Sequence, residues 1–233
     1  MIRALLWDID GTLLNFKAAE KAALKALFQS FDLGECTDDM VSRYTVINDW
    51  YWKMLEKGEM EKPKILVERF RKFFETEGVD ASRASEFNAA YQLALGDTII
   101  FCDRGDEIVQ DLKGKIPQYA VTNGTLTAQT KKLKNSGLDT LLDGAFISDQ
   151  IGFEKPDKRF FEPVFEELKG LKKDEILIIG DSLTSDMQGG VNAGIQTCWY
   201  HPKISEATNL PIDHEIRDLH EIYRILEQSG TLS

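Results

Sequence analysis

The chain has 233 residues, of which 28 are Lys or Arg and 39 are Asp or Glu, so its formal net charge is −11. A chain of this length buries about 70% of the surface that it exposes when unfolded, so neither disulfides nor a structural metal are needed for folding. The excess of acid and the lack of a dense basic run argue against duplex DNA or an anionic membrane as a partner. An anionic substrate would have to be met by a local arrangement of charge.

The cysteines and the N-terminus bear on the location of the protein. Cys36, Cys102 and Cys198 are odd in number and far apart in sequence, which is typical of reduced thiols. The N-terminal apolar run is too short for a signal peptide, and no apolar stretch approaches the roughly 20 residues of a membrane span. We therefore expect a cytoplasmic protein.

Short apolar runs recur along the chain, and they end in or beside polar residues. Residues 2–7 form the first run, which is typical of a strand buried on both faces of a parallel sheet. Segments with helical spacing separate the later runs, and this alternation predicts an α/β fold with a Rossmann-like parallel sheet. The later runs are residues 119–122, 145–148, 176–180 and 196–200.

Residues 16–95 interrupt this alternation. The region has no strand-like run, and its apolar residues fall three and four positions apart, as Leu24, Leu27 and Phe28 do. We therefore expect an all-helical segment of about four helices. Its later amphipathic segments are residues 40–55, 65–74 and 87–95, and glycines at positions 34, 58 and 78 mark the expected breaks.

An all-helical block of this size, inserted after the first strand, is expected to form a second domain that caps the edge of the sheet. The predicted boundaries give a core domain of residues 1–14 and 97–233 and a helical cap of residues 15–96. The chain shows no internal repeat and no long linker.

Two carboxylates, Asp8 and Asp10, lie at the end of the first expected strand and are followed by Gly11 and Thr12. Residues two apart on a strand point to the same side, and parallel α/β sheets bind ligands beyond the carboxyl ends of their strands. Both carboxylates should therefore point into that crevice. Taken alone, this D-x-D-G-T sequence is equally compatible with a turn that carries solvated acids.

Polar residues also lie at the end of the apolar run at residues 119–122 and in a later loop. Thr122, Asn123 and Gly124 provide a hydroxyl, a side-chain amide and backbone N–H groups, which together could bind an anion at an expected helix start. Lys155 precedes Pro156, and we expect this proline in the first turn of a helix that starts near residue 158.

A further acidic group follows the run at residues 176–180. Gly180, Asp181 and Ser182 come directly at the end of this run, and Asp186 lies four residues beyond Ser182. Each of these pieces has an ordinary interpretation as a cap or a turn. Four of them in order, at successive strand ends or adjoining loops, indicate a common site.

This ordered set resembles the haloacid dehalogenase superfamily of hydrolases. The all-helical insert directly after the first motif is similar to that superfamily's small helical cap, so the resemblance covers essentially the whole chain. The four motifs are Asp8-x-Asp10-Gly11-Thr12, Thr122-Asn123-Gly124, Lys155-Pro156 and Gly180-Asp181-Ser182-x-x-x-Asp186.

The resemblance implies a Mg²⁺-dependent phosphomonoester hydrolase that acts through an aspartyl-phosphate. Asp8 would attack phosphorus, and Asp10 would protonate the departing alcohol and later take a proton from the attacking water. Lys155 would share the catalytic site and bind the phosphate together with Thr122, Asn123 and Gly124.

The same resemblance implies a set of metal ligands. Mg²⁺ prefers hard oxygen ligands and usually retains several waters. One oxygen of Asp8, the backbone carbonyl of Asp10 and Asp181 would hold it, with Asp186 either behind these direct ligands or holding Lys155.

Within the superfamily, two stretches resemble the YjjG-like pyrimidine 5'-nucleotidase branch. Residues 186–199 match its D-x-x-G-G-x-N-A-G-x-x-T-C-W run, and Tyr44, Asn48 and Trp52 match its cap. The implied substrate is a nucleoside monophosphate, including non-standard pyrimidine ones, with Asn48 and Trp52 reading the base. Core packing with a buried, hydrogen-bonded Asn48 is the alternative for this helix face. Residues 100–106 depart from the branch because they lack the usual proline before Gly105.

Other functions fit the motifs less well. A general phosphatase of sugar phosphates or phosphoglycolate is the main alternative, because the cap sets specificity. A phosphomutase would place a histidine in or beside the cap, and residues 15–96 contain none. A dehalogenase needs no acid for an alcohol leaving group, so Asp10 favours a phosphatase, and an inactive binding module would be expected to have lost a motif residue.

Overall fold

The computed structural model describes residues 1–202 and 208–232. The chain divides into two compact units, one of Met1–Phe16 with Ile99–Ser233 and the other of Lys17–Thr98. These boundaries lie two residues later in the chain than the expected ones. None of the helices in the described part is both long and apolar enough to cross a membrane.

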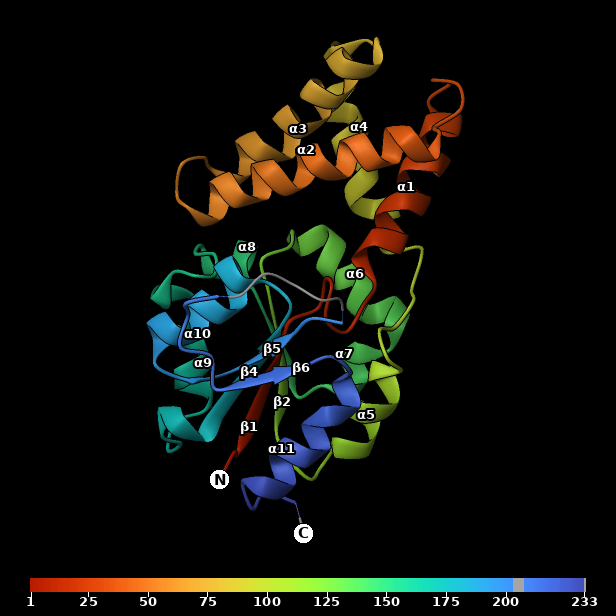
Figure 1. Ribbon diagram of the computed structural model, residues 1–233. Helices are drawn as coiled ribbons and strands as arrows, with labels where there is room; N and C mark the ends of the chain where they lie inside the picture. Colours follow the sequence, from red (N-terminus) through yellow and green to blue (C-terminus); the bar gives the residue numbers. More distant parts are fainter. Residues whose placement is uncertain (203–207, 233) are drawn as a thin grey trace. The chain divides into compact units, whose positions relative to one another are not determined.

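A six-stranded parallel sheet, in the order β3-β2-β1-β4-β5-β6, forms the centre of the first unit (Figure 1). The α/β fold expected from the alternation of apolar runs is therefore confirmed. The sixth strand was not predicted, because it has only three residues and a single buried apolar one. The strands are β1 Ala4–Trp7, β2 Gln118–Thr122, β3 Gly144–Ile147, β4 Ile176–Gly180, β5 Gln196–Tyr200 and β6 His214–Ile216.

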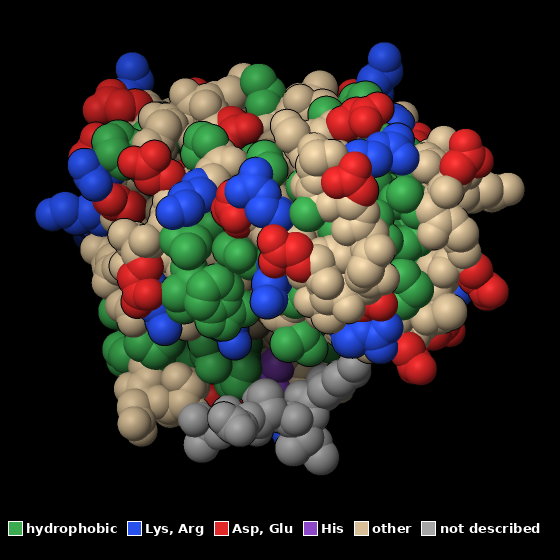
Figure 2. All heavy atoms as spheres, turned by 90° about the horizontal axis from the view of Figure 1, so that it is seen from above, with side chains coloured by type: hydrophobic (Ala, Val, Ile, Leu, Met, Phe, Trp, Pro, Cys, Tyr) green, Lys and Arg blue, Asp and Glu red, His purple; other side chains and the backbone are tan. Residues whose placement is uncertain are grey.

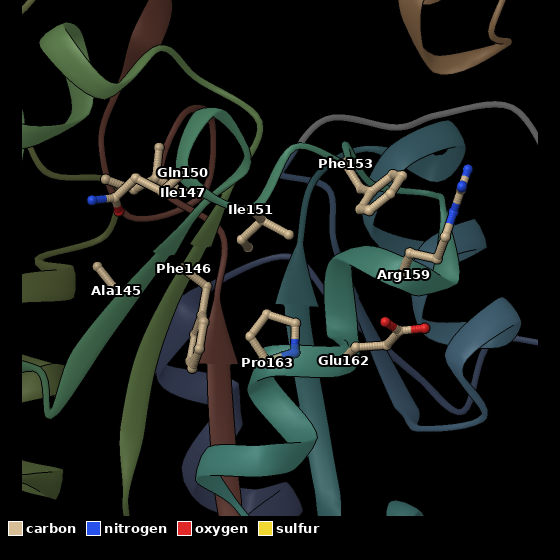
Figure 3. A pocket seen from close by; sticks show the side chains of 9 residues that line it. All are labelled: Ala145, Phe146, Ile147, Gln150, Ile151, Phe153, Arg159, Glu162 and Pro163. Atoms are coloured by element: carbon tan, nitrogen blue, oxygen red, sulfur yellow. The ribbon is translucent and has the colours of Figure 1, made fainter.

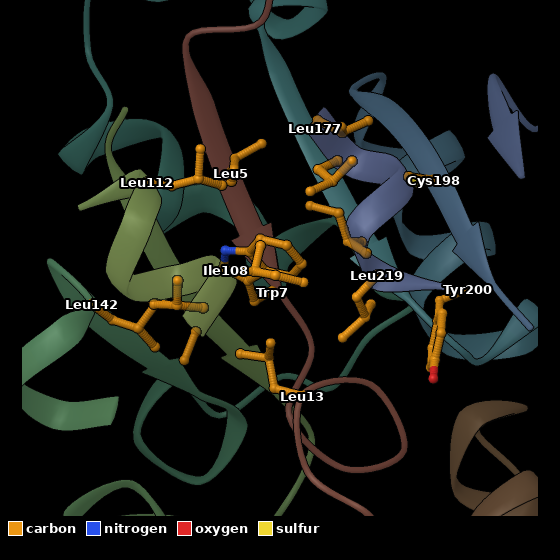
Figure 4. Close-up of a cluster of buried hydrophobic side chains, with 14 of the residues drawn as sticks. Leu5, Trp7, Leu13, Ile108, Leu112, Leu142, Leu177, Cys198, Tyr200 and Leu219 are labelled. Carbon is orange, nitrogen blue, oxygen red and sulfur yellow. The ribbon is translucent and has the colours of Figure 1, made fainter. Parts of the chain in front are cut away.

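Helices pack against both faces of this sheet because successive residues of a strand point to opposite sides. Leu5 and Trp7 of β1 belong to one buried apolar cluster (Figure 4), whereas Leu6 belongs to another. Both faces of β1 are therefore buried, which explains its uninterrupted apolar sequence. The flanking α-helices are α5 Gly105–Leu112, α6 Leu126–Ser136, α7 Leu138–Leu141, α8 Ser148–Ile151, α9 Glu162–Glu167, α10 Gln188–Ala193 and α11 Ile222–Gln228.

Short helical turns complete the first unit. The loop after β4 forms one turn of π-helix, and the remaining turns are 3₁₀ in type. These turns are η2 Lys158–Phe161, η3 Lys173–Glu175, η4 Leu183–Met187 and η5 Leu219–Glu221.

Two loops of the first unit differ from expectation. Pro156 lies before the helical turn η2, whose N-cap is Asp157, so the placement of Pro156 in a first helical turn was wrong. The Lys155–Pro156 peptide bond is cis. In the unusual segment before Gly105, Asp103 and Arg104 have φ angles of 44° and 56°, and the Asp103 carboxylate accepts the backbone N–H of Leu219 at 3.1 Å.

The second unit is a bundle of helices, as the spacing of its apolar residues predicts. Its interior is rich in aromatic rings, and Tyr44 stacks on Phe70 with ring centroids 5.0 Å apart. Gly58 and Gly78 follow two of the helices with φ angles of 72° and 68°, which only glycine adopts easily. The elements are α1 Phe16–Ser30, α2 Asp38–Glu56, α3 Lys62–Glu77, η1 Ala81–Arg83 and α4 Ala84–Ala94.

The charged side chains are mixed on the surface. On the face seen in Figure 2, Lys and Arg side chains lie among Asp and Glu side chains. This distribution agrees with a sequence that has no dense basic run.

Candidate functional site

Lys155 links the carboxyl ends of three neighbouring strands. Its Nζ donates to Asp8 Oδ1 at 2.9 Å, to Asp186 Oδ1 at 2.5 Å and to the carbonyl of Val121 at 2.7 Å. Asp8 follows β1, Val121 lies in β2, and Asp186 lies in the turn after β4. Three of the four sequence motifs thus meet at one buried ammonium group.

The carboxylates at this point outnumber the cations that contact them. Ligand oxygens of Asp8, Asp181 and Asp186 lie within 4.8 Å of one another, and among the described residues Lys155 is the cation that pairs with two of them. Burial and the negative charge of Asp186 raise the pKa of Asp8 to about 7, although Lys155 partly opposes this rise. The protein therefore provides fewer cations here than it would need to pair all three carboxylates in their ionised form.

Asp181 experiences the same excess of negative charge. Its side chain has solvent-accessible surface, but the surrounding protein atoms desolvate the carboxylate. This desolvation and the charge of Asp8, followed by that of Asp186, raise the pKa of Asp181 well above its ordinary value. A divalent cation would lower both pKa values, and Mg²⁺ fits an all-oxygen donor set.

Asp186 is held mainly by the protein. One oxygen accepts from Lys155, and Oδ2 accepts the backbone N–H of Ser182 at 3.1 Å. Burial alone would lower the pKa of Lys155, but the charges of Asp186 and Asp8 outweigh it and raise that pKa. Of the two roles considered for Asp186, the contacts favour holding Lys155.

Two glycines allow the backbone to approach the carboxylates closely. A Cβ atom on Gly11, whose φ is 101°, would lie 2.5 Å from Asp181 Oδ2, and one on Gly180 would overlap the Asp186 side chain. Thr12, the next residue of the first motif, donates its hydroxyl to Asp8 Oδ2 at 3.2 Å. The glycines of the first and fourth motifs are therefore required by packing at the site.

The Asn123 side chain connects the second motif to the third and fourth. Its Nδ2 donates to the Lys155 carbonyl at 2.8 Å and to Ser185 Oγ at 3.1 Å, and its Oδ1 accepts the Lys155 backbone N–H at 2.8 Å. Sequence reasoning considered Asn123 only as a phosphate ligand. In the structure its amide also fixes the loop that carries Lys155.

The second motif lies just before α6. The Gly124 N–H donates to Thr122 Oγ1 at 3.2 Å, and the N-cap of the helix is Thr125, whose hydroxyl accepts the N–H of Ala128 at 3.3 Å. The phosphate-binding role of Thr122, Asn123 and Gly124 stays a prediction.

Asp10 has two partners that sequence reasoning missed. Lys132 Nζ lies 2.5 Å from Asp10 Oδ1, and Gln129 Nε2 lies 2.6 Å from Oδ2. Both partners are buried in α6 on the same face as Ala128 and Leu133. Polar residues at apolar positions of a helix are the signal that could have drawn attention to them.

The cap residues of the predicted base-reading face have different environments. Asn48 is 1% exposed, donates to Glu20 Oε2 at 3.3 Å and accepts from Arg69 Nη1 at 2.6 Å, so both ends of its amide are used. These contacts favour the alternative of a buried, hydrogen-bonded Asn48. Trp52 is half-buried, with the Arg69 guanidinium 6.0 Å from its ring centroid.

Arg69 extends this cluster to another cap helix. Besides Asn48, it donates from Nη2 to Asn88 Oδ1 at 3.2 Å, and Thr45 donates to Glu20 Oε1 at 2.5 Å. Residues from α1, α2, α3 and α4 thus take part in one polar cluster inside an aromatic bundle.

A separate pocket of about 390 Å³ lies beside the edge strand β3. Figure 3 shows Phe146, Ile151 and Phe153 around it, with Arg159 and Glu162 at its border. None of the four motifs contributes to its lining. The pocket is therefore distinct from the cluster around Lys155.

Comparisons with known proteins show the family and the fold. A family model described as haloacid dehalogenase-like hydrolase matches residues 2–194. The HAD-hydrolase YfnB of Bacillus subtilis is 36% identical over 99% of this chain and 98% of its own length. Its crystal structure, bound to magnesium, superposes with a TM-score of 0.90 over 97% of this chain and 98% of that chain.

Two further relatives are named nucleotidases. The pyrimidine 5'-nucleotidase PynA of Streptococcus pneumoniae is 36% identical over 85% of this chain and 83% of its own length. The pyrimidine 5'-nucleotidase YjjG of Escherichia coli is 24% identical over 95% of this chain and 96% of its own length.

Proposed function

The chain belongs to the family of haloacid dehalogenase-like hydrolases, and from this premise we propose that it hydrolyses phosphomonoesters through an aspartyl-phosphate on Asp8. The observation that carries the proposal is the position of Asp8 beside Lys155 and among acidic side chains at the strand ends. Carboxylate nucleophiles can form covalent phosphoryl intermediates. Lys155 would neutralise part of the phosphate charge and keep Asp8 in place.

The first step transfers the phosphoryl group. A carboxylate oxygen of Asp8 attacks phosphorus, the bond from phosphorus to the alcohol oxygen breaks, and Asp10 donates a proton to that oxygen. In the second step water attacks the same phosphorus, Asp10 accepts a proton from the water, and phosphate leaves Asp8 as a free carboxylate. Thr122, Asn123 and Gly124 would bind the phosphate oxygens from the side of the second motif.

We further propose that Asp8, Asp181 and the backbone carbonyl of Asp10 hold Mg²⁺. The cation would neutralise charge on the transferred phosphoryl group. The support is the unbalanced set of carboxylates, together with the magnesium in the structure of YfnB. Asp186 would act by holding Lys155.

For the substrate we propose a pyrimidine nucleoside monophosphate, because PynA and YjjG are named pyrimidine 5'-nucleotidases. Within the cap, Trp52 is the better candidate for contact with the base, because Asn48 already uses both ends of its amide. Aromatic side chains offer a large flat area for contact with a base. Asn48 would support this surface through Arg69.

A phosphate-release screen tests the proposed function. Pyrimidine and purine nucleoside monophosphates, sugar phosphates and phosphoglycolate are compared with Mg²⁺ present, with Asp8→Asn as the blank. We expect the pyrimidine monophosphates to have the highest kcat/KM. Higher values for sugar phosphates or phosphoglycolate would instead favour the general phosphatase, and no release from any ester would contradict both.

The contribution of the cap is tested by Trp52→Ala. This change should lower kcat/KM for a pyrimidine monophosphate about tenfold, since it removes roughly 1 to 2 kcal/mol of contact with the base. The value for p-nitrophenyl phosphate, which has no base, should change little. Equal losses on both substrates would show that Trp52 only supports the bundle.

A further inference from the structure

Asp10 is held at both carboxylate oxygens by one helix. Gln129 and Lys132 lie three residues apart in α6, so their side chains leave the same face of the helix. One donor to each oxygen fixes the plane of a carboxylate, whereas a single donor would leave it free to rotate. The Asp10 side chain keeps 23% of its surface exposed, so burial alone would not hold it.

The buried environment of Lys132 favours its ion pair with Asp10. Its side chain is 2% exposed, and its Nζ lies 5.2 Å from the centre of the Phe16 ring. An ammonium group so far from water needs a close anion, and Asp10 is the carboxylate paired with it in the described part of the chain. The site therefore has two buried lysines with separate partners, Lys155 for Asp8 and Lys132 for Asp10.

The second motif leaves room for the other donor. A Cβ atom on Gly124 would overlap the Gln129 side chain. The glycine of this motif therefore allows Gln129 to pass the backbone and reach Asp10. In addition, Gln129 Oε1 is buried and is without a hydrogen-bond partner among the described residues. A half-turn of the amide would let this oxygen accept a hydrogen bond from Asp10 when Asp10 carries a proton.

We propose that Lys132 and Gln129 are positioning residues for Asp10, which fix the orientation from which Asp10 gives its proton to the leaving oxygen. This inference rests on the proposed phosphatase chemistry, in which Asp10 is the acid. Neither residue is assigned a contact with the substrate. Both act through the Asp10 carboxylate.

The acidity of the leaving group gives a readout that a purely structural role would not move. Phenyl phosphate and p-nitrophenyl phosphate have similar shapes, but phenol is a much weaker acid than p-nitrophenol. Departure of phenol therefore depends more strongly on proton donation. Because kcat/KM reports on steps up to the first irreversible one, it isolates phosphoryl transfer to the enzyme from later hydrolysis.

The variants are Lys132→Met and Gln129→Met, with Lys134→Met as the matched control on the exposed side of α6. Each positioning variant should lower kcat/KM for phenyl phosphate by about tenfold or more, a part of the usual contribution of a general acid. The value for p-nitrophenyl phosphate should fall by less than about threefold. Lys134→Met should match the wild type on both esters. Equal losses on the two esters in both variants, or no loss in either, would overturn the inference.

A double-mutant cycle tests whether Lys132 acts through Asp10. On phenyl phosphate, Asp10→Asn combined with Lys132→Met should be about as slow as Asp10→Asn alone, because the group being positioned is already lost. Additive losses would overturn the inference. Gln129→Met provides the same test at the other oxygen if Lys132→Met fails to fold.

Asp8→Asn tests the proposed function separately from the positioning role. Retention of turnover by Asp8→Asn would contradict the covalent mechanism itself. An inactive Asp8→Asn together with unaffected Lys132 and Gln129 variants would contradict only the positioning role.

Discussion

The core and the cap both bury charged side chains, but they balance those charges differently. In the core, Asp8, Asp181 and Asp186 lie close together around one ammonium group, that of Lys155. In the cap, Glu20 and Arg69 are joined through Asn48, so that one negative and one positive side chain share a bridge.

This difference distinguishes a core site that can bind a cation from a cap cluster in which an acidic and a basic side chain are already linked. Unbalanced carboxylates with raised pKa values favour binding of a cation, whose charge would offset the cost of burial. In the cap cluster both ends of the bridging Asn48 amide already have partners, so this amide is less available to a ligand than the core carboxylates are. Such a cluster instead fixes the relative positions of the helices that carry it.

The largest expected effect is the loss of turnover in Asp8→Asn. The amide has nearly the shape of the carboxylate but cannot attack phosphorus, so the rate should fall by about a thousandfold or more. Steady-state phosphate release with Mg²⁺ measures it, and circular dichroism checks the fold. Retention of more than a few per cent of the wild-type rate would contradict the role of Asp8.

Removal of the metal should have the next largest effect. Excess chelator should abolish activity and added Mg²⁺ should restore it, while Asp181→Ala should raise the Mg²⁺ concentration needed for half-maximal rate by at least about tenfold. A titration of activity against Mg²⁺ measures this. Full activity in excess chelator would contradict the requirement for Mg²⁺.

Breaking the cap cluster should destabilise the cap without direct damage to the core. Arg69→Met leaves the buried Asn48 Oδ1 without its hydrogen-bond donor and removes a positive charge near Glu20, at a cost of about 1 to 3 kcal/mol. Hydrogen exchange on the full chain should show that, relative to the wild type, this variant exchanges faster in α1 to α4, whereas exchange in the sheet strands changes little. Replacing Glu20, Asn48 and Arg69 together by Leu, Leu and Met should recover much of this loss. Failure to recover would mean that the cluster does more than hold the bundle together.

The smallest expected effect is a pH dependence of metal stabilisation. The pKa of Asp8 is raised from 3.8 to about 7, so the folded protein without metal favours the protonated group, and this contribution to stability is lost as pH rises from about 4 to about 7. Mg²⁺ binds the ionised group, and at low pH it must first displace a proton. The increase in melting temperature on adding Mg²⁺ should therefore be larger at about pH 8 than at about pH 5.5. Equal increases at both values would contradict the raised pKa.

The strands and the motif residues at their ends could be predicted from the sequence, for a physical reason. A strand buried on both faces must be continuously apolar, so Asp8 at the end of β1 and Asp181 after β4 stand out clearly. The glycines beside them are explained only by the structure, where their missing side chains make room for carboxylates.

The remaining features depend on partners that are distant in sequence. Lys132 and Gln129 contact Asp10 across about 120 residues, and helical periodicity alone assigns no partner to them. Asn48 matches a nucleotidase pattern, but its contacts with Glu20 and Arg69 require three helices to be placed. The sequence therefore predicted where the polar residues of the core lie, but not the contacts that surround Asp10 and Asn48.

The central claim is that Asp8 carries the phosphoryl group during turnover, and the most direct test is to trap it there. Asp10→Asn lacks the base for the second step, whereas departure of p-nitrophenol in the first step needs little proton donation, so this variant should accumulate the aspartyl-phosphate when mixed with p-nitrophenyl phosphate and Mg²⁺. Mass spectrometry of the acid-quenched, digested protein should find one added phosphoryl group on Asp8, and none in Asp8→Asn. Phosphate on another residue would contradict this mechanism. So would turnover by the wild type if neither the wild type nor Asp10→Asn showed phosphorylated Asp8 at any quench time.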